Sequence, residues 1–160
     1  MEKEITLEKG EKVTLSLVDT AGQEKFKCLS SQYYKNADAV LFVFALDDKM
    51  SFYNITKWMK LFYENNKNKN ILKYLIGNKN DLPIEIEEST IKIFLEEHKD
   101  LKYKSTSAKT ENDEINKFFQ GMGEEIFKNY KDIYKKGKRI KLSNDSYNNK
   151  NNCALKSCVF

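Results

Sequence analysis

The stretch AVLFVFAL, residues 39–46, decides the fold class of this chain. Eight apolar residues follow one another without a polar interruption, between Asp38 and Asp47. The run is too short for a good helix, whereas a strand buried on both faces of a parallel sheet needs such a continuous apolar run. We therefore expect a buried strand of a parallel sheet here.

The segments on either side alternate between strand patterns and helix patterns. The other expected strands are residues 3–7, 12–18, 71–78 and 102–108, and the first two read as an antiparallel pair around the turn EKGE. Apolar residues at helical spacing predict three helices, which contain Trp58, Phe94 and Phe118. This alternation favours an α/β layered sheet with right-handed crossovers, and it places Trp58 in the core rather than in a binding site.

Length and charge divide the chain into a body and a tail. With 160 residues, of which 40% are hydrophobic, we expect one domain over residues 1–134 and a basic, Lys/Asn-rich, disordered tail over residues 135–160. Residues 131–160 hold eight Lys or Arg and two Asp, a local charge of +6, so the overall +4 leaves −2 for residues 1–130. A nearly neutral body argues against a nucleic-acid groove, while a polybasic tail suits an anionic membrane surface, an acidic partner or plain solvation.

Cysteine usage and hydropathy limit the setting of the protein. Cys28, Cys153 and Cys158 make an odd number without a CxxC pair, so neither a disulfide framework nor a metal knuckle is expected. No apolar run reaches the roughly 18 residues that span a bilayer, and the N-terminus is not signal-like. These features favour the reducing cytosol.

Three polar segments follow the expected strands. DTAGQEKF (19–26), GNKNDL (77–82) and TSAK (106–109) stand at the ends of strands or directly after them. In an open α/β sheet, the loops at these strand ends gather ligands. The three segments therefore predict one binding site at the carboxyl edge of the sheet.

The order and spacing of these segments resemble the small GTPases, and specifically the Rab family, over residues 1–134. DTAGQEKF resembles the switch II segment, GNKNDL contains the NKxD guanine motif, and TSAK is similar to the third guanine-contacting motif. AGQEKF, YYKNAD (33–38) and SFYNITKW (51–58) resemble stretches that separate Rab proteins from Ras and Rho relatives. The resemblance implies the P-loop NTPase-like fold of a small GTPase, a mostly parallel sheet flanked by helices, here without the family's first strand and first helix.

The resemblance assigns the guanine side of a nucleotide site to six residues: Asn78, Lys79, Asp81, Ser107, Ala108 and Lys109. The Asp81 carboxylate can accept two N–H bonds from the guanine edge and so reject adenine. Asn78 can bridge loops and touch the base, and the alkyl stem of Lys79 can lie along the base face. The family places the backbone N–H of Ala108 toward the guanine oxygen, while Ser107 and Lys109 support the loop.

The phosphate side follows from the resemblance in the same way. Asp19 matches the aspartate that holds Mg²⁺ through water, and Gly22 matches the residue whose backbone N–H reaches the γ-phosphate. Gln23 matches the catalytic residue that orients the attacking water. The implied ligands are GTP or GDP, and the implied cofactor is Mg²⁺.

The phosphate-binding loop of the family is absent from this sequence. That loop needs two glycines five positions apart, and no pair among Gly10, Gly22, Gly77, Gly121, Gly123 and Gly137 has this spacing. The switch I threonine is missing as well. We therefore expect that this chain is an incomplete version of a Rab-like protein, through truncation, a missed exon or splicing, and inactive as a hydrolase by itself. The family's missing first strand lies between the strands at 12–18 and 39–46, so unpaired apolar edges and instability are also expected.

The last residues, CALKSCVF, suggest a lipid anchor. Cys158 is the first candidate for prenylation and Cys153 the second, although their spacing departs from the paired cysteines of most Rab proteins. The basic run at 135–141 would be the second membrane signal.

Two readings of the function follow. The first is a GTP-binding and GTP-hydrolysing switch of vesicle traffic, monomeric, on the cytosolic face of an intracellular membrane if it is prenylated. The family then implies an exchange factor, a GTPase-activating protein, a GDP-dissociation inhibitor and effectors as partners, and no nucleic acid. The alternative is a non-catalytic interaction module, a pseudo-GTPase that uses the switch II surface without nucleotide turnover.

Overall fold

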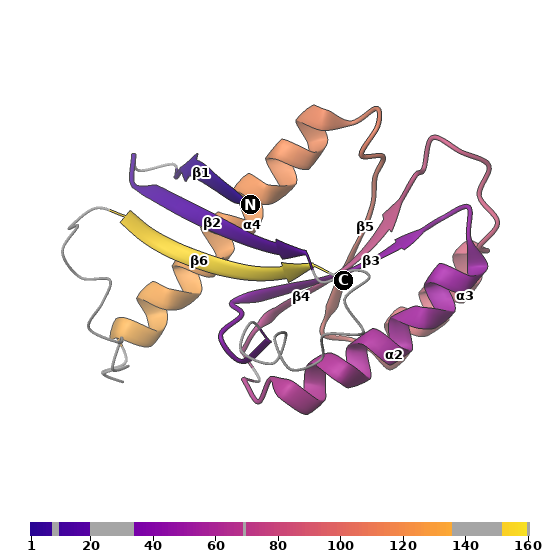
Figure 1. Cartoon of the computed structure of the whole chain (residues 1–160), viewed down its shortest axis with the longest axis horizontal. Helices are drawn as coiled ribbons and strands as arrows, with labels where there is room; N and C mark the ends of the chain where they lie inside the picture. Colours follow the sequence, from indigo (N-terminus) through magenta and orange to yellow (C-terminus); the bar gives the residue numbers. More distant parts are fainter. Residues whose placement is uncertain (8–9, 20–33, 69, 136–151, 160) are drawn as a thin grey trace.

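The structure is a computed structural model of the 160-residue chain, and it describes residues 1–7, 10–19, 34–68, 70–135 and 152–159. In these residues six strands form one sheet in the order β1-β2-β6-β3-β4-β5 (Figure 1). All neighbouring pairs are parallel except β1 with β2. The expectation of an α/β fold with a mostly parallel sheet is confirmed.

The first two strands form the hairpin that the sequence predicts. β1 (Glu2–Thr6) pairs antiparallel with β2 (Lys12–Asp19), in a register that joins Glu2 to Ser16 and Thr6 to Lys12. The turn between them needs a residue with positive φ, and Gly10 supplies it at 79°. The Gly10 N–H donates to the Leu7 carbonyl over 2.9 Å.

The three strands on the other side of the sheet are parallel. β3 (Ala39–Ala45) pairs with β4 (Leu72–Asn78), and β4 pairs with β5 (Leu101–Ser105). In β3 all residues except Val43 and Ala45 are buried. The continuous apolar run therefore marks a strand that is covered on both faces, as expected.

Helices cover both faces of the sheet (Figure 1). On one face lie α2 (Lys49–Asn65) and α3 (Glu88–Glu97), whose buried residues share a core cluster with Val40, Phe42 and Phe44 of β3. Trp58 packs against this cluster, as predicted. On the other face, α4 (Asn112–Lys135) packs with Val13 and Leu15 of β2 through Met122 and Ile126.

The tail contains a strand that the sequence reading missed. β6 (Asn152–Val159) lies between β2 and β3 and runs parallel to both, in the place that the resemblance gives to the family's first strand. Disorder is therefore the wrong expectation for these residues, and the two edges expected to be unpaired are joined through β6. The unpaired N–H and C=O groups of two facing edges favour any extended segment that can reach them. The domain boundary at 134 remains a prediction, and residues 136–151 lie outside the described residues.

Parallel pairing brings five strand ends to one edge of the sheet. β2, β3, β4, β5 and β6 end there with Asp19, Ala45, Asn78, Ser105 and Val159. The loops after β4 and β5 carry the polar segments that the sequence marks as a binding site.

Candidate functional site

Backbone hydrogen bonds join the loops that follow β4 and β5. The N–H of Thr106 donates to the Gly77 carbonyl over 2.9 Å, and the N–H of Asn80 donates to the Thr106 carbonyl over 3.2 Å. The two loops thus continue the pairing of their strands beyond the sheet. Of the six predicted guanine-side residues, Asn78 ends β4 and the other five belong to these two loops, and the structure brings them together.

Two side-chain bonds cross between the loops and fix the predicted residues. Ser107 is fully buried, and its Oγ donates to Oδ1 of Asp81 over 2.5 Å. The backbone N–H of Ala108 donates to Oδ1 of Asn78 over 3.0 Å. The same Ser107 Oγ accepts the N–H of Lys109 over 3.2 Å. A buried hydroxyl therefore orients the exposed carboxylate of Asp81.

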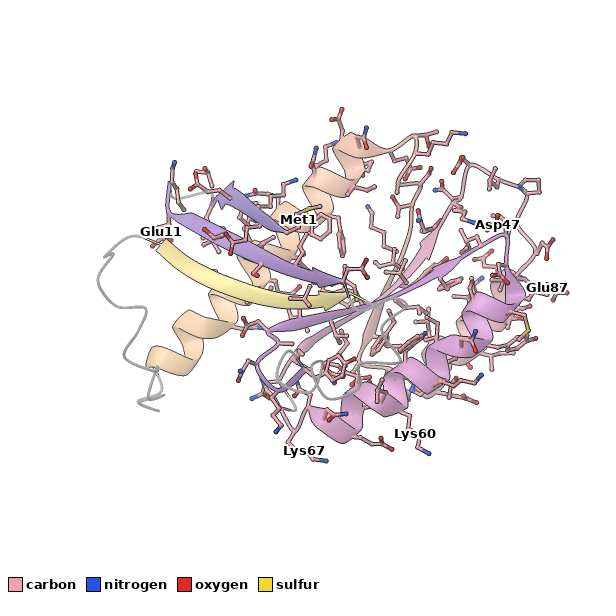
Figure 2. The ribbon with its side chains drawn as sticks, in the orientation of Figure 1. Met1, Glu11, Asp47, Lys60, Lys67 and Glu87 are labelled. Carbon is pink, nitrogen blue, oxygen red and sulfur yellow. The ribbon has the colours of Figure 1, made fainter. Side chains whose placement is uncertain are left out.

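Lys79 has an uncommon backbone conformation. Its φ is 63°, in the left-handed region that residues with a side chain seldom adopt. An ion pair with Asp47 fastens its side chain, with Nζ lying 3.1 Å from Oδ1 and 3.2 Å from Oδ2. Figure 2 shows Asp47 where β3 ends and α2 begins, so the pair connects a third strand end to the site. The sequence reading assigned Lys79 to the base and missed Asp47.

Glu111 is the other residue that the sequence reading missed. Its carboxylate accepts hydrogen bonds from Asn80 Nδ2 and Thr106 Oγ1, both over 3.0 Å, and from the N–H of Ser107 over 3.2 Å. These donors, with that of Asn80 first in effect, hold the pKa of Glu111 below its ordinary value. Glu111 thus connects both loops to the start of α4. Its place in the sequence TSAKTE, two residues beyond the motif, gave no signal for this role.

The arrangement suits a planar ligand that carries adjacent N–H donors. The exposed carboxylate of Asp81 can accept such donors, and the buried hydroxyl of Ser107 prevents the carboxylate from turning away. Lys79, whose side chain is exposed, directly follows β4 at the same edge of the sheet. An anchored carboxylate beside an alkyl stem fits the Watson–Crick edge and the face of guanine.

The phosphate side is described only in part. Asp19 is the exposed last residue of β2, at the same edge of the sheet as Asn78, while Gly22 and Gln23 lie outside the described residues. Within the described ranges no group of three or more His, Cys, Asp or Glu side chains could hold a metal ion. Among the described residues, Asp19 offers an exposed carboxylate that could help to hold the Mg²⁺ that the family implies.

The proposed lipid acceptors lie in β6. Cys153 pairs in register with Val13, and Cys158 pairs with Val18 on one side and Val40 on the other. In the part of the chain that the structure describes, no helix is long and apolar enough to cross a bilayer.

A parallel sheet with helices on both faces, and two joined loops built from NKND and TSAK at its carboxyl edge, defines a protein of the small GTPase class. Comparison with known proteins agrees, because the Ras family model matches residues 1–128. The chain belongs to the Ras family, and its curated relatives place it among the Rab-like small GTPases.

Three relatives illustrate the extent of the match. The Ras-related protein Rab-11B of Dictyostelium discoideum is 37% identical over 145 residues, which cover 87% of this chain and 62% of the relative. Rab-34 of Mus musculus is 44% identical over 69 residues, 43% of this chain and 27% of the relative. Rab-13 of Bos taurus is 31% identical over 137 residues, 84% of this chain and 64% of the relative. The chain thus spans less than two thirds of the length of these relatives.

Proposed function

We propose that this chain recognises the guanine base of GTP or GDP at the edge formed by the loops after β4 and β5. The observation that carries the proposal is the pair of bonds across the two loops, from Ser107 to Asp81 and from Ala108 to Asn78. The bond from Ser107 pre-organises the Asp81 carboxylate before the ligand arrives, which lowers the entropic cost of binding, and the bond from Ala108 keeps the two loops joined until the base arrives. Membership of the Ras family, whose members are GTPases, supports guanine as the base.

Each guanine-side residue has a separate task. Asp81 accepts two N–H groups of the base, and Ser107 orients Asp81. Lys79 lies along the base face, where its ion pair with Asp47 holds its backbone in place. Asn78 holds the loop that begins with Ala108 and Lys109, and the Ala108 N–H exchanges its bond to Asn78 for one to the guanine oxygen when the base binds.

The phosphate side is where this chain is weakest. In our proposal Asp19, Gly22 and Gln23 keep their family roles toward Mg²⁺, the γ-phosphate and the attacking water. The 160 residues contain no GxxxxGK[ST] loop, however. Backbone amides and a lysine in such a loop supply much of the phosphate affinity. The chain on its own should therefore bind the base weakly and hydrolyse no GTP.

The cellular role is proposed from the family. A Rab-like switch in vesicle traffic would work with an exchange factor, a GTPase-activating protein, a GDP-dissociation inhibitor and effectors. It would reach the cytosolic face of a membrane through a prenyl group on Cys158 or Cys153, assisted by the basic residues 135–141. If base binding is found without turnover even with these partners present, the non-catalytic module is the better description.

Binding of nucleosides tests base recognition without involving phosphates. Calorimetric titration should show guanosine binding and no adenosine binding. Asp81→Asn should weaken guanosine binding at least about 30-fold, because it removes about 2–4 kcal/mol of charge-assisted hydrogen bonding. Glu96→Gln makes the same change of charge at an exposed position of α3 and should change nothing. Equal binding of adenosine, or undiminished guanosine binding by Asp81→Asn, would reject the proposal.

A further inference from the structure

β6 is paired with its two neighbouring strands over different lengths. Along β2 it is paired over its whole length, from Asn152 opposite Lys12 to Val159 opposite Asp19. Along β3 only its last three residues are paired, with Ala39–Leu41. Within the part of the chain that the structure describes, residues 152–156 therefore have a paired strand on one side only, and this part of β6 resembles an edge strand in the middle of the sheet.

The sequence of β6 is poorly matched to a central strand. β3 consists entirely of apolar residues, AVLFVFA, whereas β6 reads NCALKSCV, with Asn152, Lys156 and Ser157 among eight residues. Strands between two parallel neighbours usually read as continuous apolar runs, and the three polar residues of β6 depart from that pattern. Asn, Lys, Ala and Ser also have low or moderate strand propensity. Composition and pairing thus agree that β6 is held less firmly than β3.

The rest of the fold has contacts that do not involve β6. The core cluster between β3, α2 and α3 contains, among the described residues, none from β1 or β2. The second cluster joins the two halves of the sheet, because α4 packs Met122 and Ile126 with Leu15 of β2 as well as with Leu41 of β3. α4 therefore gives the two halves of the sheet a common core cluster that does not depend on the β6 ladder.

We propose that β6 is a detachable strand, and that the slot between β2 and β3 is a binding site for residues 152–159 in a parallel, extended conformation. Main-chain hydrogen bonds to β2 and β3 hold this segment in place, as they hold peptides that add a strand to a sheet. Release and return of such a segment is a local opening of the fold with a free energy below that of global unfolding.

Detachment decides whether two cysteines can be modified. Cys153 and Cys158 are ladder residues in the inserted state, and a chain end cannot pair in a sheet and lie extended in the active site of a modifying enzyme at the same time. The slot therefore competes with any lipid attachment at these thiols. That consequence rests on the proposed membrane function, whereas the detachable strand does not.

Hydrogen exchange and thiol labelling on the full chain test the strand directly. In a Cys28→Ser background, Cys153 and Cys158 are the remaining thiols. N-ethylmaleimide labelling is followed by peptide mass spectrometry, and Trp58 emission reports whether the β3–β5 half stays folded. Ser157→Pro removes a ladder N–H at a position paired with both Leu17 and Ala39, and Ser157→Ala is the matched control that keeps it.

The proposal gives a definite pattern of results. Amides of residues 152–159 should exchange at least about tenfold faster than those of β3, yet slower than in the free peptide 152–160. Ser157→Pro should speed labelling at least about tenfold with unchanged Trp58 emission, and Ser157→Ala should match the parent.

Exchange of β6 amides as slow as that of β3 amides, or loss of the Trp58 signal in Ser157→Pro, would show that β6 is a permanent strand. Parent labelling as fast as in the free peptide would show that the slot is not occupied by this segment. Guanosine binding takes no part in this readout, so the two proposals can fail separately.

Discussion

Replacing Ser107 by alanine tests the link between the two loops. Ser107 is fully buried, donates to the Asp81 carboxylate over 2.5 Å, and accepts the N–H groups of Lys109 and Thr110 over 3.2 Å each. Alanine removes all three bonds with little change in volume. The loop should lose its attachment to Asp81 while the sheet remains intact.

The magnitude follows from the kind of each bond. A hydrogen bond to a charged group contributes about 1.5–3 kcal/mol, and a neutral one about 0.5–1.5 kcal/mol. Asp81, Lys109 and Thr110 are exposed, so water replaces part of what is lost. We therefore expect a loss of about 2–4 kcal/mol in the free energy of unfolding. With a urea dependence of about 2 kcal/mol per molar, the midpoint should fall by about 1–2 M.

The assay combines urea unfolding, followed by Trp58 emission, with calorimetric titration of guanosine. Guanosine binding should fall about 10- to 100-fold in Ser107→Ala, because Asp81 is no longer held in place. Thr110→Ala, an exposed change in the same loop, serves as control and should leave both quantities within experimental error. A stability loss below about 1 kcal/mol together with undiminished guanosine binding would show that Ser107 positions neither Asp81 nor the loop.

Three further predictions concern packing, helix propensity and pH. Phe62→Ala should cost about 3–5 kcal/mol of stability in urea unfolding, because Phe62 is fully buried in the α2 cluster, and a loss below about 2 kcal/mol would contradict that packing. Gly121→Ala should raise stability by about 0.5–1 kcal/mol, because its new Cβ has no neighbour within 4 Å, whereas Gly123→Ala should fail to show this gain, since its Cβ would collide with Cδ1 of Ile5. The pKa of Glu111 is lower in the folded chain than its ordinary value of 4.5. The stability that this difference contributes is present above pH 4.5 and is lost as the pH falls through the folded pKa. Acid unfolding of Glu111→Gln should lack this loss of stability, and identical acid profiles of the two chains would contradict the role of Glu111.

Most of the fold could be predicted from the sequence, because the central strand β3 is a continuous run of apolar residues. Residues 39–46 could hardly be anything other than a buried strand, and the structure has β3 at Ala39–Ala45. The hairpin and the guanine-side loops followed from local signals in the same way. β6 had no such signal: Asn, Lys and Ser dominate the tail around Leu155, so its composition indicated disorder while its place depends on the long-range pairing offered by β2 and β3.

The site shows the same division between local and long-range information. The motifs predicted that Asn78, Asp81 and Ser107 belong to one site, and the structure brings these residues together through bonds between the two loops. Glu111 and Asp47 were missed, since each contacts the site through folding rather than through a motif. Neither residue type is unusual in its own segment, so a single sequence could not have singled them out.

We propose that this chain holds a guanine-binding edge without a phosphate site of comparable strength. A comparison of guanosine and GTP, each titrated into the purified 160-residue chain with Mg²⁺ present, tests it most directly. The two dissociation constants should lie within about tenfold of each other, because the triphosphate adds little binding. Cradling amides and a lysine contribute about 1.5–3 kcal/mol each, so three such bonds correspond to about three to six powers of ten. GTP bound by that much more tightly than guanosine, or released in stoichiometric amount on denaturation, would show that the chain has a strong phosphate site.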